Sequence, residues 1–259
     1  MNTMVSQTDR TISVHNEHEL LLKMEKAGLN DELAQKVIDS KGNDLAAKVV
    51  RLIENGGFEP SSSEKRAREI MGRNFFGIEE AIKRFGVNPS QAQTAALSEV
   101  PFTEEVLESC KDTHILVAVF PVSILAVRAK VERKLFYSHE GSWYNKEPFA
   151  KDRGEIGWRL VRKTPVPDST SKTWDEQQAL LDKSEETPSA QVMVYTIIGH
   201  YLATGERLFE KLPVVRTNSV DSGGDRVGVG YFDQDGLHVD RWWVDRRDGH
   251  VGGSSARKS

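Results

Sequence analysis

The chain has 259 residues, of which 38% are hydrophobic and 29% charged; this length predicts one or two domains, and the composition excludes a disordered chain. Its 35 Lys and Arg residues against 39 Asp and Glu residues give a formal charge of -4, which disfavours a generally basic binder of nucleic acid or membrane surfaces. The longest apolar run, residues 115–122, contains Pro121 and is far shorter than the roughly 20 residues of a membrane-spanning helix.

The N-terminus shows no basic segment followed by an apolar stretch, so the sequence predicts no secretory signal peptide. We therefore expect the protein in the cytoplasm or on a virus particle, without a membrane partner. The only cysteine is Cys110, which cannot form an internal disulfide and is compatible with a reducing compartment.

Aromatic residues divide the chain into two unlike parts. All five Trp and all five Tyr residues lie after residue 113, whereas residues 1–113 are rich in the helix-favouring Leu, Ala, Glu and Lys. The sequence thus predicts a small all-α region over residues 1–113 and a second domain over residues 114–259.

The first region predicts short helices that begin at capping side chains and end at glycines. Asn30 and Thr103 are the clearest caps, and apolar residues recur at helical spacing. The expected helices cover residues 17–27, 30–40, 43–55, 64–72, 78–85 and 103–111.

One basic cluster in this region has two interpretations. Lys65, Arg66, Arg68 and Arg73 could belong to a DNA-reading helix of a regulator, or they could form the solvated face of a helix that packs on a core. Charged faces are common on surface helices, so the second interpretation is favoured.

The second part predicts strands mixed with two capped helices. The run 115–120 is continuously apolar, which is typical of a strand buried on both faces. The Thr173 to Glu176 capping box opens a helix to about residue 181, and Ser189 opens a longer apolar helix closed by Gly205. Further strands are expected at residues 123–127, 134–137, 142–144, 157–161, 212–217 and 226–232.

Recognisable catalytic motifs are missing from the sequence. The glycine-rich stretch 223–230 lacks the Gly-Lys-Ser/Thr ending of a phosphate-binding loop and is interpreted as a hairpin. His200 lies in an apolar helix and is interpreted as a half-buried side chain with a partner rather than a metal ligand. Several tail aspartates could bind a hard cation, although neighbouring arginines compete for them; these are Asp233, Asp235, Asp240, Asp245 and Asp248.

The composition of residues 231–250 is the most unusual feature of the chain. Tyr, Phe, Trp, His, Asp and Arg alternate with Gly, as in a protein-binding paratope, where rigid aromatics supply contact area at low entropic cost. The competing interpretation is an ordinary aromatic-rich terminal hairpin that packs on the core.

Several segments together resemble a known family. The stretch GWRL at residues 157–160, the capped helix after Thr173, the helix from Ser189 to Thr204 and the tail from Arg226 resemble the C-type-lectin fold of the formylglycine-generating-enzyme type. More narrowly, they resemble the variable proteins of diversity-generating retroelements. The resemblance implies an α+β fold whose C-terminal C-type-lectin-like domain follows the small helical region.

In that family, error-prone reverse transcription at adenines rewrites a C-terminal variable region, which here corresponds to residues 226–259. Asn codons mutated at their first two bases can yield Tyr, Phe, Asp, His, Arg, Ser, Gly or Val, but not Trp. At least one of Trp242 and Trp243 is thus expected in the scaffold, while Leu237 and Val239 are expected to point inward. The residues expected to form the variable ligand-binding surface are Tyr231, Asp233, His238, Asp240, Arg241, Trp243, Asp245, Arg247, Asp248 and His250.

The sequence departs from the enzymes of this superfamily. Their active-site cysteine pair is missing, and Glu147-Pro148-Phe149 only partly matches the calcium-binding motif of true lectins. The resemblance therefore implies a non-enzymatic binding protein without metal or cofactor, with a protein or peptide as ligand.

Charge supports that ligand class, because six Lys and Arg against five Asp nearly balance over residues 226–259. The helical region would then serve as an adaptor or oligomerisation module. Two alternatives remain: a metal-dependent hydrolase that uses the Asp-rich tail, and a DNA-binding regulator that uses the helical region.

Overall fold

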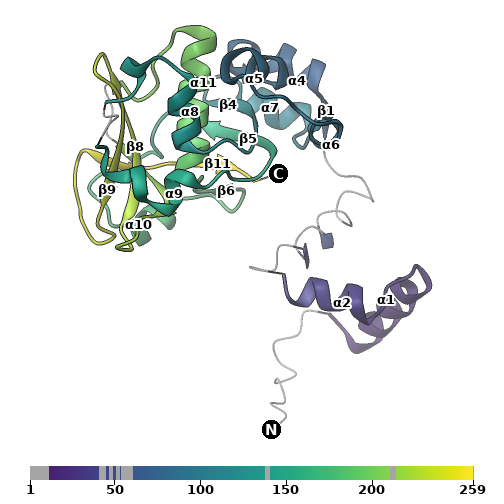
Figure 1. Ribbon diagram of the computed structural model, residues 1–259. Coiled ribbons are helices and arrows are strands. Elements are labelled where there is room, and N and C mark those ends of the chain that lie inside the picture. Colours follow the sequence, from purple (N-terminus) through teal and green to yellow (C-terminus); the bar gives the residue numbers. More distant parts are fainter. Residues whose placement is uncertain are drawn as a thin grey trace. The chain divides into compact units, whose positions relative to one another are not determined.

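The computed structural model describes residues 12–40, 45, 46, 49, 50, 53, 61–137, 141–210 and 214–258 (Figure 1). The chain forms two compact units, residues 1–59 and residues 60–259, and each is considered by itself. Helices and three sheets together make the protein a mixed α+β chain, as the sequence predicted.

The first unit contains helices α1 (Val14–Lys26) and α2 (Asp31–Ile38). Ser13 Oγ accepts from the Asn16 N–H at 3.2 Å, and Asn30 Oδ1 accepts from the Leu33 N–H at 3.0 Å, which confirms the predicted Asn30 cap. Neither helix contains a buried residue. Most of the helix predicted over residues 43–55 lies outside the described residues.

The second unit is built on a five-stranded sheet. Strand β4 (His114–Val119) is buried along its whole length, which confirms the strand predicted at residues 115–120. It pairs in parallel with β2 and antiparallel with β5. The remaining strands of the order β2–β4–β5–β11–β6 are β2 (Phe75–Phe76), β5 (Gly157–Arg162), β11 (Ala256–Arg257) and β6 (Glu185–Glu186).

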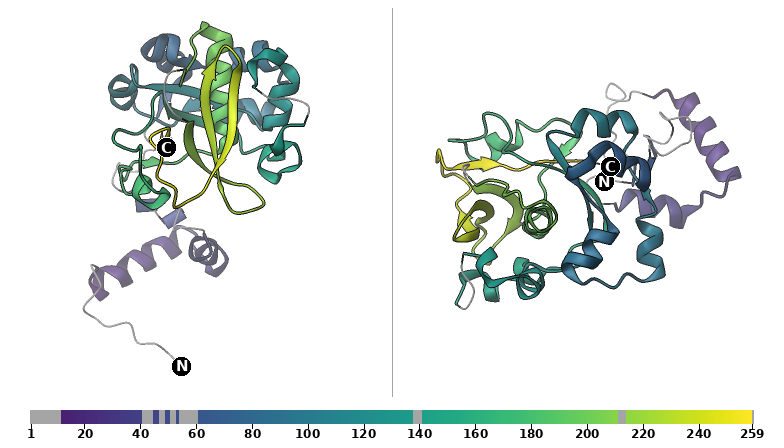
Figure 2. Two further views of the ribbon diagram at one scale, coloured as in Figure 1. Left: turned by 90° about the vertical axis from the view of Figure 1, so that its left-hand side faces the viewer. Right: turned by 90° about the horizontal axis from the view of Figure 1, so that it is seen from above.

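A four-stranded sheet carries the C-terminal segment of the chain. Its order is β10–β7–β8–β9, with β10 parallel to β7 and the other pairs antiparallel. Strands β8 and β9 form the hairpin that is yellow-green in Figure 2. The strands are β7 (Val214–Val220), β8 (Arg226–Asp233), β9 (Gly236–Trp242) and β10 (Val251–Gly253).

Helix α11 (Ala190–Thr204) joins the two sheets, because it contacts β2 and β4 of one and β7 and β8 of the other (Figure 2). Ser189 caps its start and Gly205, with a φ of 76°, ends it, as predicted. Residues 190–200 are all buried, so the helix is apolar on every side, as expected of a helix enclosed between layers.

Shorter elements cover this core. Helix α10 (Trp174–Gln178) opens with the predicted Thr173–Glu176 capping box. A two-stranded sheet pairs β1 (Ser62–Ser63) with β3 (Glu99–Val100). The other helices are α4 (Glu64–Met71), α5 (Ile78–Phe85), α6 (Gln91–Ala96), α7 (Glu104–Cys110), α8 (Ile124–Lys130) and α9 (Pro148–Lys151).

The structure corrects the domain boundary expected between residues 113 and 114. Phe75 and Phe76 pair with Leu116 and Val117, and α4, α5 and α7 contribute side chains to the core that underlies both sheets. Residues 61–113 therefore belong to the second unit, because they complete its sheet and its core.

Three expected strands, at residues 123–127, 134–137 and 142–144, are also wrong. Residues 123–127 begin helix α8, since Ser123 Oγ accepts from the Ala126 N–H at 3.2 Å and caps it. In place of a hairpin near residues 134–144, the described residues form the 3-10 turns η4 (Arg133–Leu135) and η5 (Trp143–Lys146). Burial of Leu135 and Tyr144 in the core, rather than strand pairing, fixes these turns.

Candidate binding surface

Most predicted site residues lie on β9 and on the loop that follows it, residues 243–250. Leu237 and Val239 are buried, which confirms the expected inward alternation. Tyr231 is 48% exposed and Trp243 is 60% exposed, so two large aromatic side chains of this segment face solvent.

The hairpin tip is held by its own turn and by a distant segment. Asp233 Oδ1 accepts from the Asp235 N–H at 2.8 Å, and Gly236 adopts a φ of 111°. The backbone of Phe136 lies so close that an added Cβ on Gly236 would be 2.5 Å from the Phe136 carbonyl carbon. Asp233 thus shapes the turn, and Gly236 permits the close approach.

Three aromatic rings meet on the hairpin: Tyr231 of β8, His238 of β9 and Tyr137 from a distant segment. The His238 ring is stacked on Tyr137 at a centroid distance of 3.9 Å and meets Tyr231 edge-on at 5.2 Å. His238 Nδ1 lies 4.0 Å from Asp240 Oδ2. Burial raises the pKa of the Asp240 carboxyl, and nearby His238 only partly opposes that rise.

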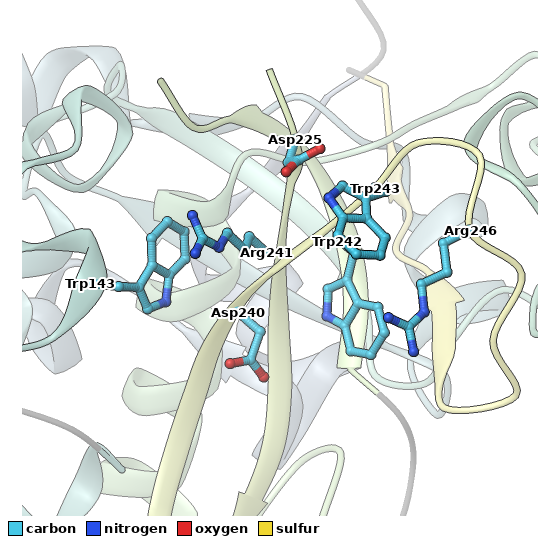
Figure 3. A pocket seen from close by; sticks show the side chains of 7 residues that line it. All are labelled: Trp143, Asp225, Asp240, Arg241, Trp242, Trp243 and Arg246. Carbon is cyan, nitrogen blue, oxygen red and sulfur yellow. The ribbon is translucent and has the colours of Figure 1, made fainter. Parts of the chain in front are cut away.

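Next to this stack, a hollow of about 640 Å³ opens on the surface (Figure 3). Arg241 points toward Trp143, its guanidinium carbon 5.5 Å from the ring centroid. Arg246 lies 5.1 Å from the Trp242 ring and 5.7 Å from the Trp243 ring. The hollow is lined by Trp143, Asp225, Asp240, Arg241, Trp242, Trp243 and Arg246.

Trp242 and Trp243 differ in their surroundings. The Trp242 indole lies against β8, where an added Cβ on Gly228 would be 2.8 Å from Trp242 Cδ1. Trp243 is the more exposed of the two and faces the hollow. Trp242 therefore packs against the sheet that supports the hollow, and Trp243 is part of the exposed surface.

Sequence reasoning missed Trp143, Asp225 and Arg246, which line the hollow from outside the predicted set. Trp143 comes from η5, and its Nε1–H donates to the Val239 carbonyl at 2.8 Å. Asp225 follows the turn between β7 and β8. Residues from three separate segments thus meet around the end of β9.

The backbone of the loop 243–250 is held by a buried cation. Arg216 on β7 is fully buried, and its Nη2 donates to the carbonyls of Trp243 at 2.9 Å and of Arg246 at 2.6 Å. Its Nη1 donates to the Lys172 carbonyl and to Gln177 Oε1. Burial lowers the pKa of Arg216, but five donors and a high intrinsic pKa keep this group charged.

Two more backbone contacts fix the same loop. The Trp174 N–H donates to the Val244 carbonyl at 2.8 Å, and the Ser171 N–H donates to the Asp248 carbonyl at 3.0 Å. These contacts all reach main-chain atoms of the loop. They do not depend on which side chains the loop carries.

Three predicted site residues form ion pairs or hydrogen bonds at the surface. Arg247 pairs with Glu176, with its Nη1 2.6 Å from Oε2, and this hydrogen bond lowers the pKa of Glu176 to about 2. Asp248 accepts from the His250 N–H at 2.9 Å and from Arg246 Nη2 at 3.0 Å. Asp248 thus braces the loop through its side chain, and its expected place in the ligand-binding surface stays a prediction.

The remaining sequence candidates have ordinary structural roles. His200 is buried and lies 3.2 Å from Glu206 Oε2, so its predicted pairing is confirmed. Arg66, Arg68 and Arg73 of the basic cluster each pair with glutamates; these are Glu69, Glu104, Glu64, Glu79, Glu80 and Glu206. Such pairing fits the charged helix face better than a DNA-reading surface, which needs cations available for phosphates.

Among the described residues, no three His, Cys, Asp or Glu side chains gather closely enough to hold a metal ion. The helices in that same part of the chain are all too short or too polar to cross a membrane. No known protein family, curated protein or solved structure matches the chain.

Proposed function

We propose that the protein is a non-enzymatic binding protein whose C-terminal surface, residues 226–259, is diversified by adenine-directed reverse transcription on a C-type-lectin-like domain. The observation that carries the proposal is the way in which this segment is held. The main chain of residues 237–248 is held by hydrogen bonds from residues outside the proposed variable surface. The exposed side chains of this segment project into solvent from that supported backbone.

The supporting bonds reach main-chain carbonyls between Leu237 and Asp248. Trp143 Nε1–H holds the Val239 carbonyl and the Tyr137 N–H holds the Leu237 carbonyl, the latter at 3.2 Å. Arg216 and the N–H groups of Trp174 and Ser171 hold the loop 243–250. Because every one of these bonds ends on a main-chain carbonyl, replacing an exposed side chain such as Tyr231 or Trp243 leaves them intact. Asp233 and Asp248 are exceptions within the segment, since their own side chains accept from main-chain N–H groups.

The exposed groups suit recognition of a protein or peptide. Trp243 and Tyr231 offer large rigid surfaces, which are enriched at binding hot spots. Arg241 and Asp240 beside them supply charges that set partner choice. The first unit, whose Leu20, Leu33 and other apolar side chains stay exposed, would serve as an adaptor or oligomerisation module.

A substitution library tests this proposal. All combinations of the residues that adenine mutagenesis allows are introduced at Tyr231, His238, Asp240, Arg241 and Asp245. We expect most members to melt cooperatively within about 5 °C of the parent, because these side chains contribute little to the core. Cell-surface display with a protease challenge counts the folded members.

A matched library at buried positions of the same strands is the control; it changes Val227, Val229, Phe232, Leu237 and Val239 to the same residue types. We expect few of its members to survive protease. Equal survival in the two libraries, or collapse of the first, would contradict the proposal. Genomic DNA adds an independent readout, since a near-copy of the coding segment should differ from it opposite adenines.

A further inference from the structure

The carboxylate of Asp240 lies in the hollow without a strong counter-charge. In the described part of the chain, the one basic side chain within 4.0 Å of it is that of His238, with 4.0 Å between Nδ1 and Oδ2. The arginines that line the same hollow face other groups, since Arg246 pairs with Asp248 and Arg241 lies over Trp143. The Asp240 side chain is 42% exposed, so a partner can reach this carboxylate, and a cation that the partner brings would supply a counter-charge.

The walls of the hollow accept planar cations. Arg246 lies over the rings of Trp242 and Trp243, and Arg241 lies over Trp143, at centroid distances of 5.1 to 5.7 Å (Figure 3). These contacts show that a guanidinium can lie against each indole at this site. These arginines lie close to the 6 Å limit for a cation–π contact. A guanidinium from a partner could therefore approach the same rings more closely.

Charge at the rim points in the same direction. Asp225 lines the hollow as a second carboxylate, and the charge of Arg246 is offset by Asp248 at 3.0 Å. Arg241 is therefore the one lining cation that is not offset within the described residues. Two carboxylates against one such cation favour a positively charged ligand group.

We infer that the hollow binds an arginine side chain of a partner peptide, with the guanidinium paired to Asp240 and stacked on an indole of the Trp143, Trp242 and Trp243 set. This inference rests on the proposed function and specifies which group of a partner peptide this surface binds. The guanidinium fits better than an ammonium, because its planar fork meets a carboxylate in two bonds and stacks on aromatic faces.

Titration of the full-length chain with N-acetyl-arginine amide tests the inference, followed by NMR of the indole N–H signals of the three tryptophans. We expect saturable shifts with the arginine probe. The neutral citrulline analogue, which has nearly the same shape, should bind about tenfold more weakly or not at all. The lysine analogue should bind more weakly than the arginine probe.

Asp240→Asn keeps the side-chain shape and removes the charge, and should weaken binding of the arginine probe about tenfold or more. Asp235→Asn is the matched control, because it removes the same charge at the exposed hairpin tip, and should leave binding unchanged. Equal binding of citrulline, an unaltered affinity in Asp240→Asn, or preference for N-acetyl-glutamate amide would overturn the inference.

The arginine-probe titration and the surface library test two different claims, and their failures can be told apart. If the arginine probe does not bind while the surface library still folds, only the ligand class is wrong. If the surface library collapses, the diversified surface is wrong, whether or not the probe binds to this chain.

Discussion

His114 illustrates how one buried side chain makes stability depend on pH. Its imidazole is 4% exposed at the start of β4, and Nδ1 lies 2.8 Å from Thr113 Oγ1. Burial, followed by the nearby charges of Arg162 and Arg257, lowers the pKa of His114 from 6.5 to about 4. Between pH 6.5 and pH 4, the imidazole of His114 therefore stays neutral in the folded protein but binds a proton in the unfolded chain.

The sign of the effect follows from that difference. As pH falls from 6.5 toward 4, the unfolded state takes up a proton that the folded state refuses, so stability is lost over this window. We expect His114 to cost about 3 kcal/mol of unfolding free energy between these limits. Urea unfolding at pH 7 and at pH 4.5 measures the loss.

Removing the titrating group should flatten this dependence. In His114→Leu, the difference in unfolding free energy between pH 7 and pH 4.5 should shrink by more than half, whatever the stability at pH 7. His250→Leu removes an exposed histidine of the loop and serves as the control for the loss of a histidine elsewhere in the chain. If both variants retain the parent's pH dependence, the buried imidazole is not its source.

At the scale of elements, the β8–β9 hairpin depends on one glycine. Gly236 has a φ of 111°, and an added Cβ would lie 2.5 to 2.8 Å from backbone atoms of Phe136 and Tyr137. A backbone contact cannot rotate away as a flexible side chain can, so the hairpin would have to move off the segment that supports it.

Gly236→Ala should therefore lower the unfolding free energy by about 2–3 kcal/mol, from the clash and from the positive φ together. Urea unfolding measures the change. Gly249→Ala, on the loop beyond β9, meets only Ser171 Oγ at 3.7 Å and should cost much less. Similar losses in the two variants would show that Gly236 is not a point of close approach.

Elements with local signals could be predicted from the sequence. The caps at Asn30, Thr103, Thr173 and Ser189 are bonds between side chains and backbone three residues apart, so the residue types reveal them. The Ser90–Gln93 box of α6 carries a similar signal and was overlooked.

Elements fixed by distant contacts could not be predicted in this way. The turns η4 and η5 form because burial of Leu135 and Tyr144 overrides local strand preference. The site shows the same division, since inward Leu237 and Val239 follow from alternation. Trp143 lies 96 residues from the Val239 carbonyl that it binds, and no local pattern encodes that contact.

At the scale of the whole molecule, the two units make unequal contributions to stability. The described helices of the first unit bury no residue, whereas Phe76, Phe85 and Leu107 lie in the core of the second unit beneath its sheets. The sheet that carries the proposed binding surface, with strands β7, β8 and β9, thus depends on residues as early as the short strand β2.

Two truncations separate the possible boundaries. A chain of residues 60–259 should fold and melt within about 5 °C of the full-length protein, because it retains the entire core of the second unit. A chain of residues 114–259 should show no cooperative melting, since it lacks β2 and the core side chains of α4, α5 and α7. Calorimetry and near-ultraviolet circular dichroism distinguish these outcomes. Cooperative melting of the shorter chain would show that residues 114–259 fold without residues 61–113, as the sequence predicted.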